Sequence, residues 1–359
     1  MSRSCIAFIF VLVFASCNKN EPEPIQESRN FQMGFTTWPY GPNPEDVDDT
    51  YAYLQANGDI YAEHIDNNIP WNALINDSPL PAEFTQSMDF KVSKRLPNTN
   101  LLLSVSLLNL DRNDLATDLD GVVPDYTSFS DEQIEDAYFE YIDYLIGRFN
   151  PDYLVSAIEV NELYINAPDK WEGYKELMHN VNNRISEAYP DLKISESMTL
   201  HNLYQPQVAA PETYLNEVFD YMNQMDFAAI SFYPFFKDLQ TQEEFQEAFD
   251  FMHNRLDVPI AFAETAHIAE DLVVPNLNLS IPGSESEQDI YLKTLLTNAE
   301  AQNYEFVIWW AHRDYDALWE TFPPELQDIG QLWRDSGILN EEGNERLSAL
   351  TWRSYLSEK

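Results

Sequence analysis

The chain has few cysteines and few glycines, and each shortage excludes a class of chemistry. Of 359 residues only 2 are cysteine and 10 are glycine. Both cysteines, Cys5 and Cys17, lie at the N-terminus, so the remaining chain has no disulfide and no thiolate nucleophile. Glycine-rich loops that hold phosphate groups are correspondingly scarce. The stability of the folded part must therefore come from packing of its core.

Basic residues are also scarce. Lys and Arg number 20 against 61 Asp and Glu, which gives a net charge of -41. Such a field repels the phosphate backbone of a nucleic acid, so we expect no nucleic-acid partner. The acidity fits a well-solvated surface equally well and by itself identifies no ligand. We expect no cofactor and no metal.

Only one long apolar run occurs, and it lies at the N-terminus. Residues 5–15 follow Arg3 and are too few to span a bilayer, which is typical of a signal peptide. The run ends in FASC (14–17), which resembles the lipobox of bacterial lipoproteins, whose cysteine carries the lipid. We therefore predict a signal peptide over 1–16, a lipid on Cys17 and a flexible acidic tether over 17–30. An ordinary secretory signal with an unmodified cysteine is the alternative.

The rest of the chain alternates strand-like and helix-like segments. Short apolar runs that predict strands occupy 31–38, 59–65, 101–108, 153–162, 192–200, 227–234, 259–265 and 306–312. Helical patterns lie between them, for example over 131–149, with Ser130 as the expected N-cap, and over 170–189. Eight such units predict an α/β protein, a single-domain (β/α)₈ TIM barrel over 31–359. An open doubly wound sheet is less favoured, because no glycine-rich turn follows the first strand.

Carboxylates terminate two of these strands. Asn161 and Glu162 end the fourth predicted strand, and Glu264 ends the seventh. In a barrel of this type the strand ends meet at one mouth, where the active site lies. Two carboxyl groups across one cavity suit glycosidic hydrolysis, since one protonates the leaving oxygen and the other attacks the sugar.

These segments resemble the clan A glycoside hydrolases, retaining (β/α)₈ enzymes. The resemblance of IEVNE (158–162) implies Glu162 as acid/base and Asn161 as the contact to the sugar 2-hydroxyl. AFAET (261–265) implies Glu264 as nucleophile, and AISFYPFF (229–236) implies that Tyr233 hydrogen-bonds it. FVIWW (306–310) resembles the eighth strand, whose Trp floors the cleavage subsite. Strand alternation allows only one of its two Trp to face inward, and we favour Trp310. Two segments resemble family 53 endo-β-1,4-galactanases, although the family stays open.

Histidine and tryptophan residues supply the other candidate substrate contacts. Four of six His lie at predicted strand ends, namely His64, His201, His267 and His312. Trp38 and Trp71 lie where their rings could stack on pyranose faces. Only Arg313 is placed to bind an acidic sugar, so a neutral sugar is favoured.

The sequence thus predicts a monomeric, retaining, endo-acting β-glycoside hydrolase of a neutral poly- or oligosaccharide (β-galactan, β-mannan or β-glucan). It would be exported and held at a bacterial outer membrane by the lipid on Cys17. Two alternatives stay open. One is a non-catalytic carbohydrate-binding lipoprotein, and the other is a metal-dependent barrel hydrolase that uses His64, His201 and His267.

Overall fold

The computed structural model describes residues 29–66 and 68–357, and it confirms the predicted barrel. The predicted signal peptide, Cys17 and nearly all of the tether lie outside these described residues. The barrel strands are β1 (Gln32–Thr36), β2 (Ile60–Ile65), β3 (Asn100–Val105), β4 (Tyr153–Val155), β5 (Lys193–Ser195), β6 (Ser197–Thr199), β7 (Ala228–Phe232), β8 (Ile260–Thr265) and β11 (Phe306–Trp309). A small hairpin, β9 (Leu272–Val274) with β10 (Leu279–Ile281), lies beyond β8.

The nine barrel strands form one parallel sheet that nearly closes on itself. Their order is β5-β4-β3-β2-β1-β11-β8-β7-β6. The two outermost strands, β5 and β6, are halves of the predicted fifth strand, and only Glu196 separates them. Because β5 pairs with β4 while β6 pairs with β7, this single segment joins both ends of the sheet. The predicted eight units therefore hold, with the fifth strand divided.

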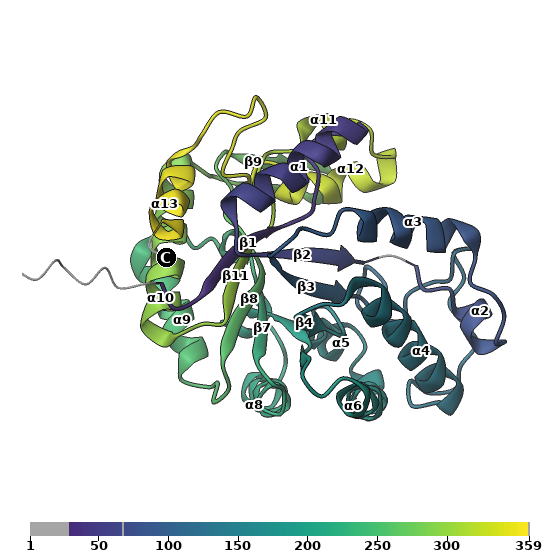
Figure 1. Cartoon of the computed structure of the whole chain (residues 1–359). Helices are drawn as coiled ribbons and strands as arrows, with labels where there is room; N and C mark the ends of the chain where they lie inside the picture. Colours follow the sequence, from purple (N-terminus) through teal and green to yellow (C-terminus); the bar gives the residue numbers. More distant parts are fainter. Residues whose placement is uncertain (1–28, 67, 358–359) are drawn as a thin grey trace, which may run out of the picture.

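Helices surround the strands (Figure 1). They are α1 (Pro44–Asn57), α2 (Trp71–Ile75), α3 (Ala82–Ser93), α4 (Glu132–Phe149), α5 (Asn161–Asn166), α6 (Trp171–Ala188), α7 (Leu200–Leu203), α8 (Pro211–Met222), α9 (Gln242–His253), α10 (Glu285–Gln302), α11 (Asp316–Trp319), α12 (Pro324–Gly330) and α13 (Leu347–Leu356). Four short 3₁₀ turns are Pro168–Lys170, Pro234–Lys237, Pro275–Leu277 and Gln331–Trp333. Among the described residues, no helix has both the length and the apolar character needed to cross a bilayer.

Helix α4 illustrates why these segments become helices. Its buried residues recur every three or four positions, from Ile134 to Phe149, so one face packs on the sheet. The expected N-cap, Ser130, is wrong by one position, because Asp131 is the N-cap residue. The Asp131 side chain accepts a hydrogen bond from the Thr127 hydroxyl at 2.9 Å and leaves the helix N–H groups uncapped.

Alternating strand residues divide the core into two layers. The residues that fill the barrel interior are Ile60, Ala62, Leu102, Tyr153, Val155, Ile158, Phe227, Ala229, Ala261, Ala263, Phe306 and Ile308. The larger layer lies between the strands and the helices. Gly34 lets β1 approach β2, since a Cβ there would lie 1.7 Å from the Ile60 carbonyl oxygen.

The fourth strand is shorter than predicted. β4 ends at Val155, and the chain bends through residues 156–160 before α5 begins at Asn161. Glu159 adopts φ 55°, a left-handed conformation that interrupts an extended strand. Asn161 and Glu162 therefore start a helix instead of ending a strand, although they still lie at the carboxyl side of the barrel.

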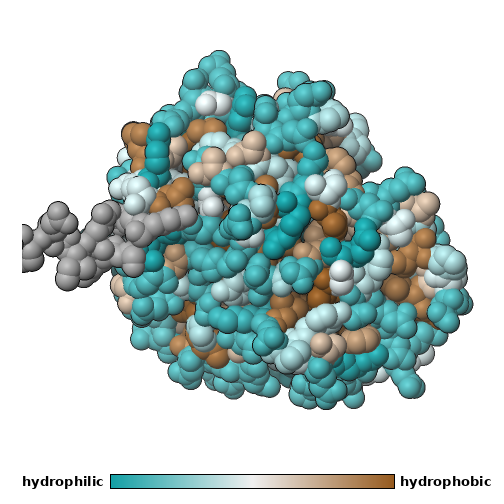
Figure 2. Space-filling model, in the orientation of Figure 1, coloured by the Kyte–Doolittle hydropathy of each residue, from teal (hydrophilic) through white to brown (hydrophobic). Residues whose placement is uncertain are grey.

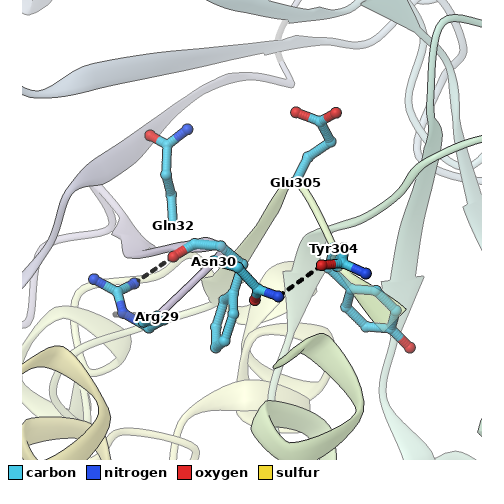
Figure 3. A pocket seen from close by; sticks show the side chains of 7 residues that line it. Arg29, Asn30, Gln32, Tyr304 and Glu305 are labelled. Carbon is cyan, nitrogen blue, oxygen red and sulfur yellow. Dashed lines mark hydrogen bonds between the residues drawn. The ribbon is translucent and has the colours of Figure 1, made fainter. Parts of the chain in front are cut away.

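A cavity of about 360 Å³ lies at the opposite end of the barrel, near the N-terminal ends of β1 and β11. Asn30 donates to the Asn303 side chain at 2.7 Å, and Arg29 donates to the Phe31 carbonyl. Figure 3 shows Arg29, Asn30, Gln32, Tyr304 and Glu305 around this cavity. Other polar side chains that line it bond residues outside the cavity, as Gln32 does with Asn100 and Glu305 with Lys193. This cavity is far along the barrel from the predicted catalytic carboxyl groups, which lie beyond the C-terminal strand ends.

Candidate active site

The predicted nucleophile lies at the carboxyl end of β8. Tyr233, which follows β7, donates its hydroxyl to Glu264, as the sequence comparison implied. His64, near the end of β2, has its Nδ1 3.4 Å from a Glu264 oxygen. The carboxyl group is only 12% exposed. Burial and the nearby charge of Glu159 raise its pKa well above the usual value, while the Tyr233 hydrogen bond opposes that rise.

The predicted acid/base lies in the first turn of α5. Asn202 donates its amide to the Glu162 carboxyl group at 3.1 Å. Burial and then the charge of Glu159 raise the pKa of Glu162 to about 7, against an opposing effect of Arg112. A carboxyl group with such a pKa retains its proton near neutrality and suits general acid catalysis.

Glu162 and Glu264 both lie at the carboxyl side of the barrel, one in the first turn of α5 and the other near the end of β8. Glu159 raises the pKa of each carboxyl group and Arg112 lowers each. Figure 2 shows the molecular outline indented on this side, between the surface over α11 and α12 and the surface over α3. On this side of the barrel the two carboxyl groups have different hydrogen-bond partners.

A charged cluster beside these residues was not predicted. Arg112, in the loop after β3, lies between Asp66 and Glu159, with nitrogen-to-oxygen distances of 3.3 and 3.2 Å. Ser231, in β7, donates its hydroxyl to Glu159 at 2.7 Å. Glu159 could have been noticed in the sequence, because IEVNE (158–162) contains a carboxylate besides that of Glu162. No sequence pattern indicated Arg112, because it lies in an irregular loop.

Aromatic rings line one side of the site, as expected. Trp310 lies 5.3 Å from Trp38 and 5.5 Å from His64, measured between ring centroids. Trp309 faces the other way: it is fully buried and donates its indole N–H to the Ser336 carbonyl at 2.9 Å. The structure therefore favours Trp310 over Trp309 as the mouth residue, in line with strand alternation.

Trp333 adds a further aromatic ring beside Tyr233, the hydrogen-bond partner of the nucleophile. Its ring centroid lies 5.6 Å from that of Tyr233 and 5.9 Å from that of Phe236. His201 lies near the same group, 5.4 Å from Phe236, and precedes Asn202, the partner of Glu162. Trp333 belongs to a short 3₁₀ turn, and its helical pattern gave no sign that it would reach the mouth.

The expected role of Asn161 is corrected. Its side chain is buried, and its amide nitrogen donates to the Tyr214 hydroxyl at 2.8 Å and to the Thr199 hydroxyl at 3.0 Å. Its amide oxygen accepts from the Thr199 backbone N–H at 2.8 Å. Since these bonds occupy the amide inside the protein, Asn161 ties α5 to β6 and α8 and is not free to bind a sugar 2-hydroxyl.

Three further expected substrate contacts are wrong. Trp71 is fully buried and donates to the Ala116 carbonyl at 2.7 Å. His267 is also buried, with its two ring nitrogens 2.9 and 3.2 Å from backbone carbonyl oxygens. His312 is buried against Tyr53 of α1, with ring centroids 4.8 Å apart. All three are core residues: backbone carbonyl oxygens pair with Trp71 and His267, whereas the buried Nδ1 of His312 has no hydrogen-bond partner.

The His-based metal site considered from sequence is not assembled, since His267 is bonded elsewhere. Among residues 29–66 and 68–357, the group with metal-ligand spacing is Glu270, Asp314 and Glu341. Arg346 already pairs with Asp314 and with Glu270 in that group, the latter at 2.8 Å. A guanidinium group therefore already pairs with two of the three carboxyl groups.

Comparisons with known proteins relate the chain to glycoside hydrolases. The sequence model described as glycosyl hydrolase family 53 matches residues 154–316, somewhat less than half of the chain, and this segment contains Glu162 and Glu264. None of the curated proteins matches the chain.

Solved structures share the fold. The Ignisphaera aggregans GH53 catalytic domain has a TM-score of 0.56 and 14% identity, over 93% of this chain and 97% of that one. Fungal β-1,4-galactanases have a TM-score of 0.57 and 14% identity, over 84% of this chain and 90% of theirs. A variant of GH5_18 from Bifidobacterium longum in complex with Manβ1-4GlcNAc has a TM-score of 0.65 and 12% identity, over 91% of this chain and 78% of that one. The chain is a glycoside hydrolase built on a (β/α)₈ barrel, and it resembles family 53 of the clan A enzymes.

Proposed function

We propose that the chain is a retaining, endo-acting β-glycoside hydrolase of a neutral polysaccharide, with Glu162 as acid/base and Glu264 as nucleophile. The observation that carries the proposal is the contrast between the two carboxyl groups at one mouth. Glu264 is contacted by Tyr233 and His64, whereas Glu162 has a single amide donor. Such a difference separates the roles of acid and nucleophile.

In the first step the Glu264 carboxylate attacks the anomeric carbon while Glu162 gives its proton to the leaving oxygen. A covalent glycosyl-Glu264 ester forms and the aglycone departs. In the second step Glu162, now ionised, takes a proton from water, and the water oxygen displaces Glu264 from the anomeric carbon. Two inversions leave the configuration unchanged, and Glu162 is protonated again.

A neutral β-glycan fits the charges at the mouth. Arg112 is occupied by Asp66 and Glu159, and Arg313, the residue considered from sequence, stacks on Tyr40 and donates to the Glu341 carbonyl. Neither is free to bind a uronic acid carboxylate. The rings of Trp38 and Trp310 suit the apolar faces of pyranoses. We propose β-1,4-galactan as the first substrate to test, followed by β-mannan and β-glucan, because β-1,4-galactanases and a mannose-containing complex are among the similar structures.

Replacement of each carboxyl group tests the mechanism. Glu264→Gln should abolish hydrolysis of every substrate. Glu162→Gln should abolish hydrolysis of polysaccharide but spare the first step for an aryl glycoside whose leaving group needs no proton. Proton NMR of the first product should show retention of the β-anomer. Inversion, or full activity of Glu264→Gln, would refute the proposal.

We also propose that the protein is exported and anchored to a bacterial outer membrane through Cys17. The lipobox-like FASC (14–17) and the acidic residues that follow it support this. Metabolic labelling with a fatty acid should mark the wild-type protein and leave Cys17→Ala unlabelled. Equal labelling of both proteins would exclude this anchor.

A further inference from the structure

Glu159 is a carboxylate of the active site that the two-residue mechanism leaves without a role. One of its oxygens accepts the Ser231 hydroxyl at 2.7 Å, and the other lies 3.2 Å from the Arg112 guanidinium. Its side chain is 17% exposed, so it borders the opening while these two bonds hold it. A surface glutamate would have no such fixed partners on two other elements.

The backbone of Glu159 is held in an uncommon conformation. Its φ of 55° is left-handed, and a residue with a side chain adopts it at a cost of about 1–2 kcal/mol. Its N–H donates to the Ser197 hydroxyl at 2.8 Å, and its carbonyl accepts the Glu162 N–H at 3.2 Å. The same residue therefore supplies a fixed carboxylate and begins the turn that carries Glu162.

Charged and titratable groups face Glu159 from most sides of the mouth. They are His64 and Asp66 at the end of β2, Arg112 after β3, Glu162 in α5, Tyr233 after β7, and Glu264 in β8. Arg112 is the cation in this group, and it is shared between Asp66 and Glu159. The surroundings of Glu162 and Glu264 therefore keep a net negative charge.

We propose that Glu159 is a positioning residue of the active site, whose fixed negative charge keeps Glu162 protonated as the general acid. This inference rests on the proposed function. The charge disfavours ionisation of both neighbouring carboxyl groups. Glu264 has the Tyr233 hydroxyl and the His64 ring beside it to stabilise its carboxylate, whereas Glu162 has one neutral amide. Glu264 thus has more groups beside it that stabilise an ionised carboxylate than Glu162 has.

The test is the pH dependence of kcat/KM for wild type and Glu159→Gln, with the polysaccharide that the enzyme cleaves. The alkaline limb reports ionisation of the acid in the free enzyme. Removing the charge should move this limb to lower pH by roughly 1 unit, with the acid limb moving in the same direction. A residue that only supports the fold would lower activity at every pH and leave both limbs in place, and that result would overturn the proposal.

Two controls separate local charge from other effects. Glu172→Gln removes one carboxylate that is 81% exposed on α6, so both limbs should stay at their wild-type positions. Ser231→Ala removes a hydrogen bond to Glu159 but keeps its charge, so the alkaline limb should move much less than in Glu159→Gln. A shift in Glu172→Gln equal to that in Glu159→Gln would overturn the proposal, because any charge on the molecule would then suffice.

A variant of opposite sign keeps the inference testable if Glu159→Gln does not fold, as judged by thermal unfolding. Arg112→Gln removes the cation that favours ionisation of Glu162, so the alkaline limb should move to higher pH. No movement would count against the proposal. Glu162→Gln and Glu264→Gln are assayed in parallel. If these two variants keep full activity, the proposed function itself fails. If they are inactive but the pH limbs of Glu159→Gln and Arg112→Gln stay at their wild-type positions, only the role of Glu159 is refuted.

Discussion

At the scale of single residues, the contact between Tyr233 and Glu264 determines when the nucleophile ionises. The Tyr233 hydroxyl donates to the carboxyl group and lowers a pKa that burial has raised. In Tyr233→Phe we expect the acid limb of the kcat/KM profile to move to higher pH, because the carboxylate loses a donor. A hydrogen bond to a charged group contributes about 1.5–3 kcal/mol, so kcat/KM should fall about tenfold to a hundredfold.

Tyr141→Phe is the matched control for that variant. Tyr141 is also a buried tyrosine, but its hydroxyl has no hydrogen-bond partner. Its removal should change neither the limb nor the rate. An acid limb that stays in place in Tyr233→Phe would show that the hydroxyl does not stabilise the carboxylate.

At the scale of elements, strand β11 separates a structural tryptophan from a functional one. Trp309 packs among buried residues, whereas the neighbouring Trp310 lies against Trp38 and His64 at the mouth. Trp309→Ala should lower the free energy of unfolding by about 3–5 kcal/mol, as expected for a large ring removed from a core. Trp310→Ala should lower kcat/KM with a much smaller loss of stability. Denaturant unfolding and kinetics on both variants make the comparison, and the reverse pattern would contradict the assignment.

Helices α6 and α8 enclose a second buried carboxyl group, outside the barrel, that should make stability depend on pH. Glu196 accepts the hydroxyls of Tyr174 and Tyr221 and the amide of Asn182. Burial raises its pKa to about 7 despite these donors. Because the folded pKa exceeds the unfolded one of about 4.5, its stabilising contribution is complete below pH 4.5 and is lost as pH rises through about 7.

The corresponding prediction compares wild type with Glu196→Gln, which resembles the protonated side chain. The wild type should lose stability relative to the variant across this range, by on the order of 3 kcal/mol at most. Thermal unfolding at a series of pH values measures the difference. Glu172→Gln on the exposed side of α6 should keep the wild-type dependence, and a parallel response of all three proteins would refute the assignment to Glu196.

At the scale of the whole molecule, the alternation of segments was enough to predict the barrel and the mouth that holds Glu162 and Glu264. It could not predict the local backbone after β4, where the left-handed Glu159 turns Asn161 inward and brings an extra carboxylate to the opening. Nor could it distinguish His64 from His267. Both follow the same pattern in sequence, and only tertiary packing decides which ring meets Glu264 and which meets backbone carbonyls.

The described chain begins at the end of the barrel opposite the catalytic mouth, which predicts how an anchored enzyme would face its substrate. Arg29 and Asn30 line the cavity at the N-terminal strand ends, whereas Glu264 lies at the carboxyl end of β8 (Figure 1). If Cys17 carries a lipid, the residues up to Arg29 span at most about 40 Å, and the barrel is held by the end at which its strands begin. The mouth then points away from the bilayer. We expect the lipidated protein on vesicles to cleave a soluble polysaccharide with the same kcat/KM as a soluble form that begins at Arg29, whereas a strong loss on vesicles would mean that the membrane covers the mouth.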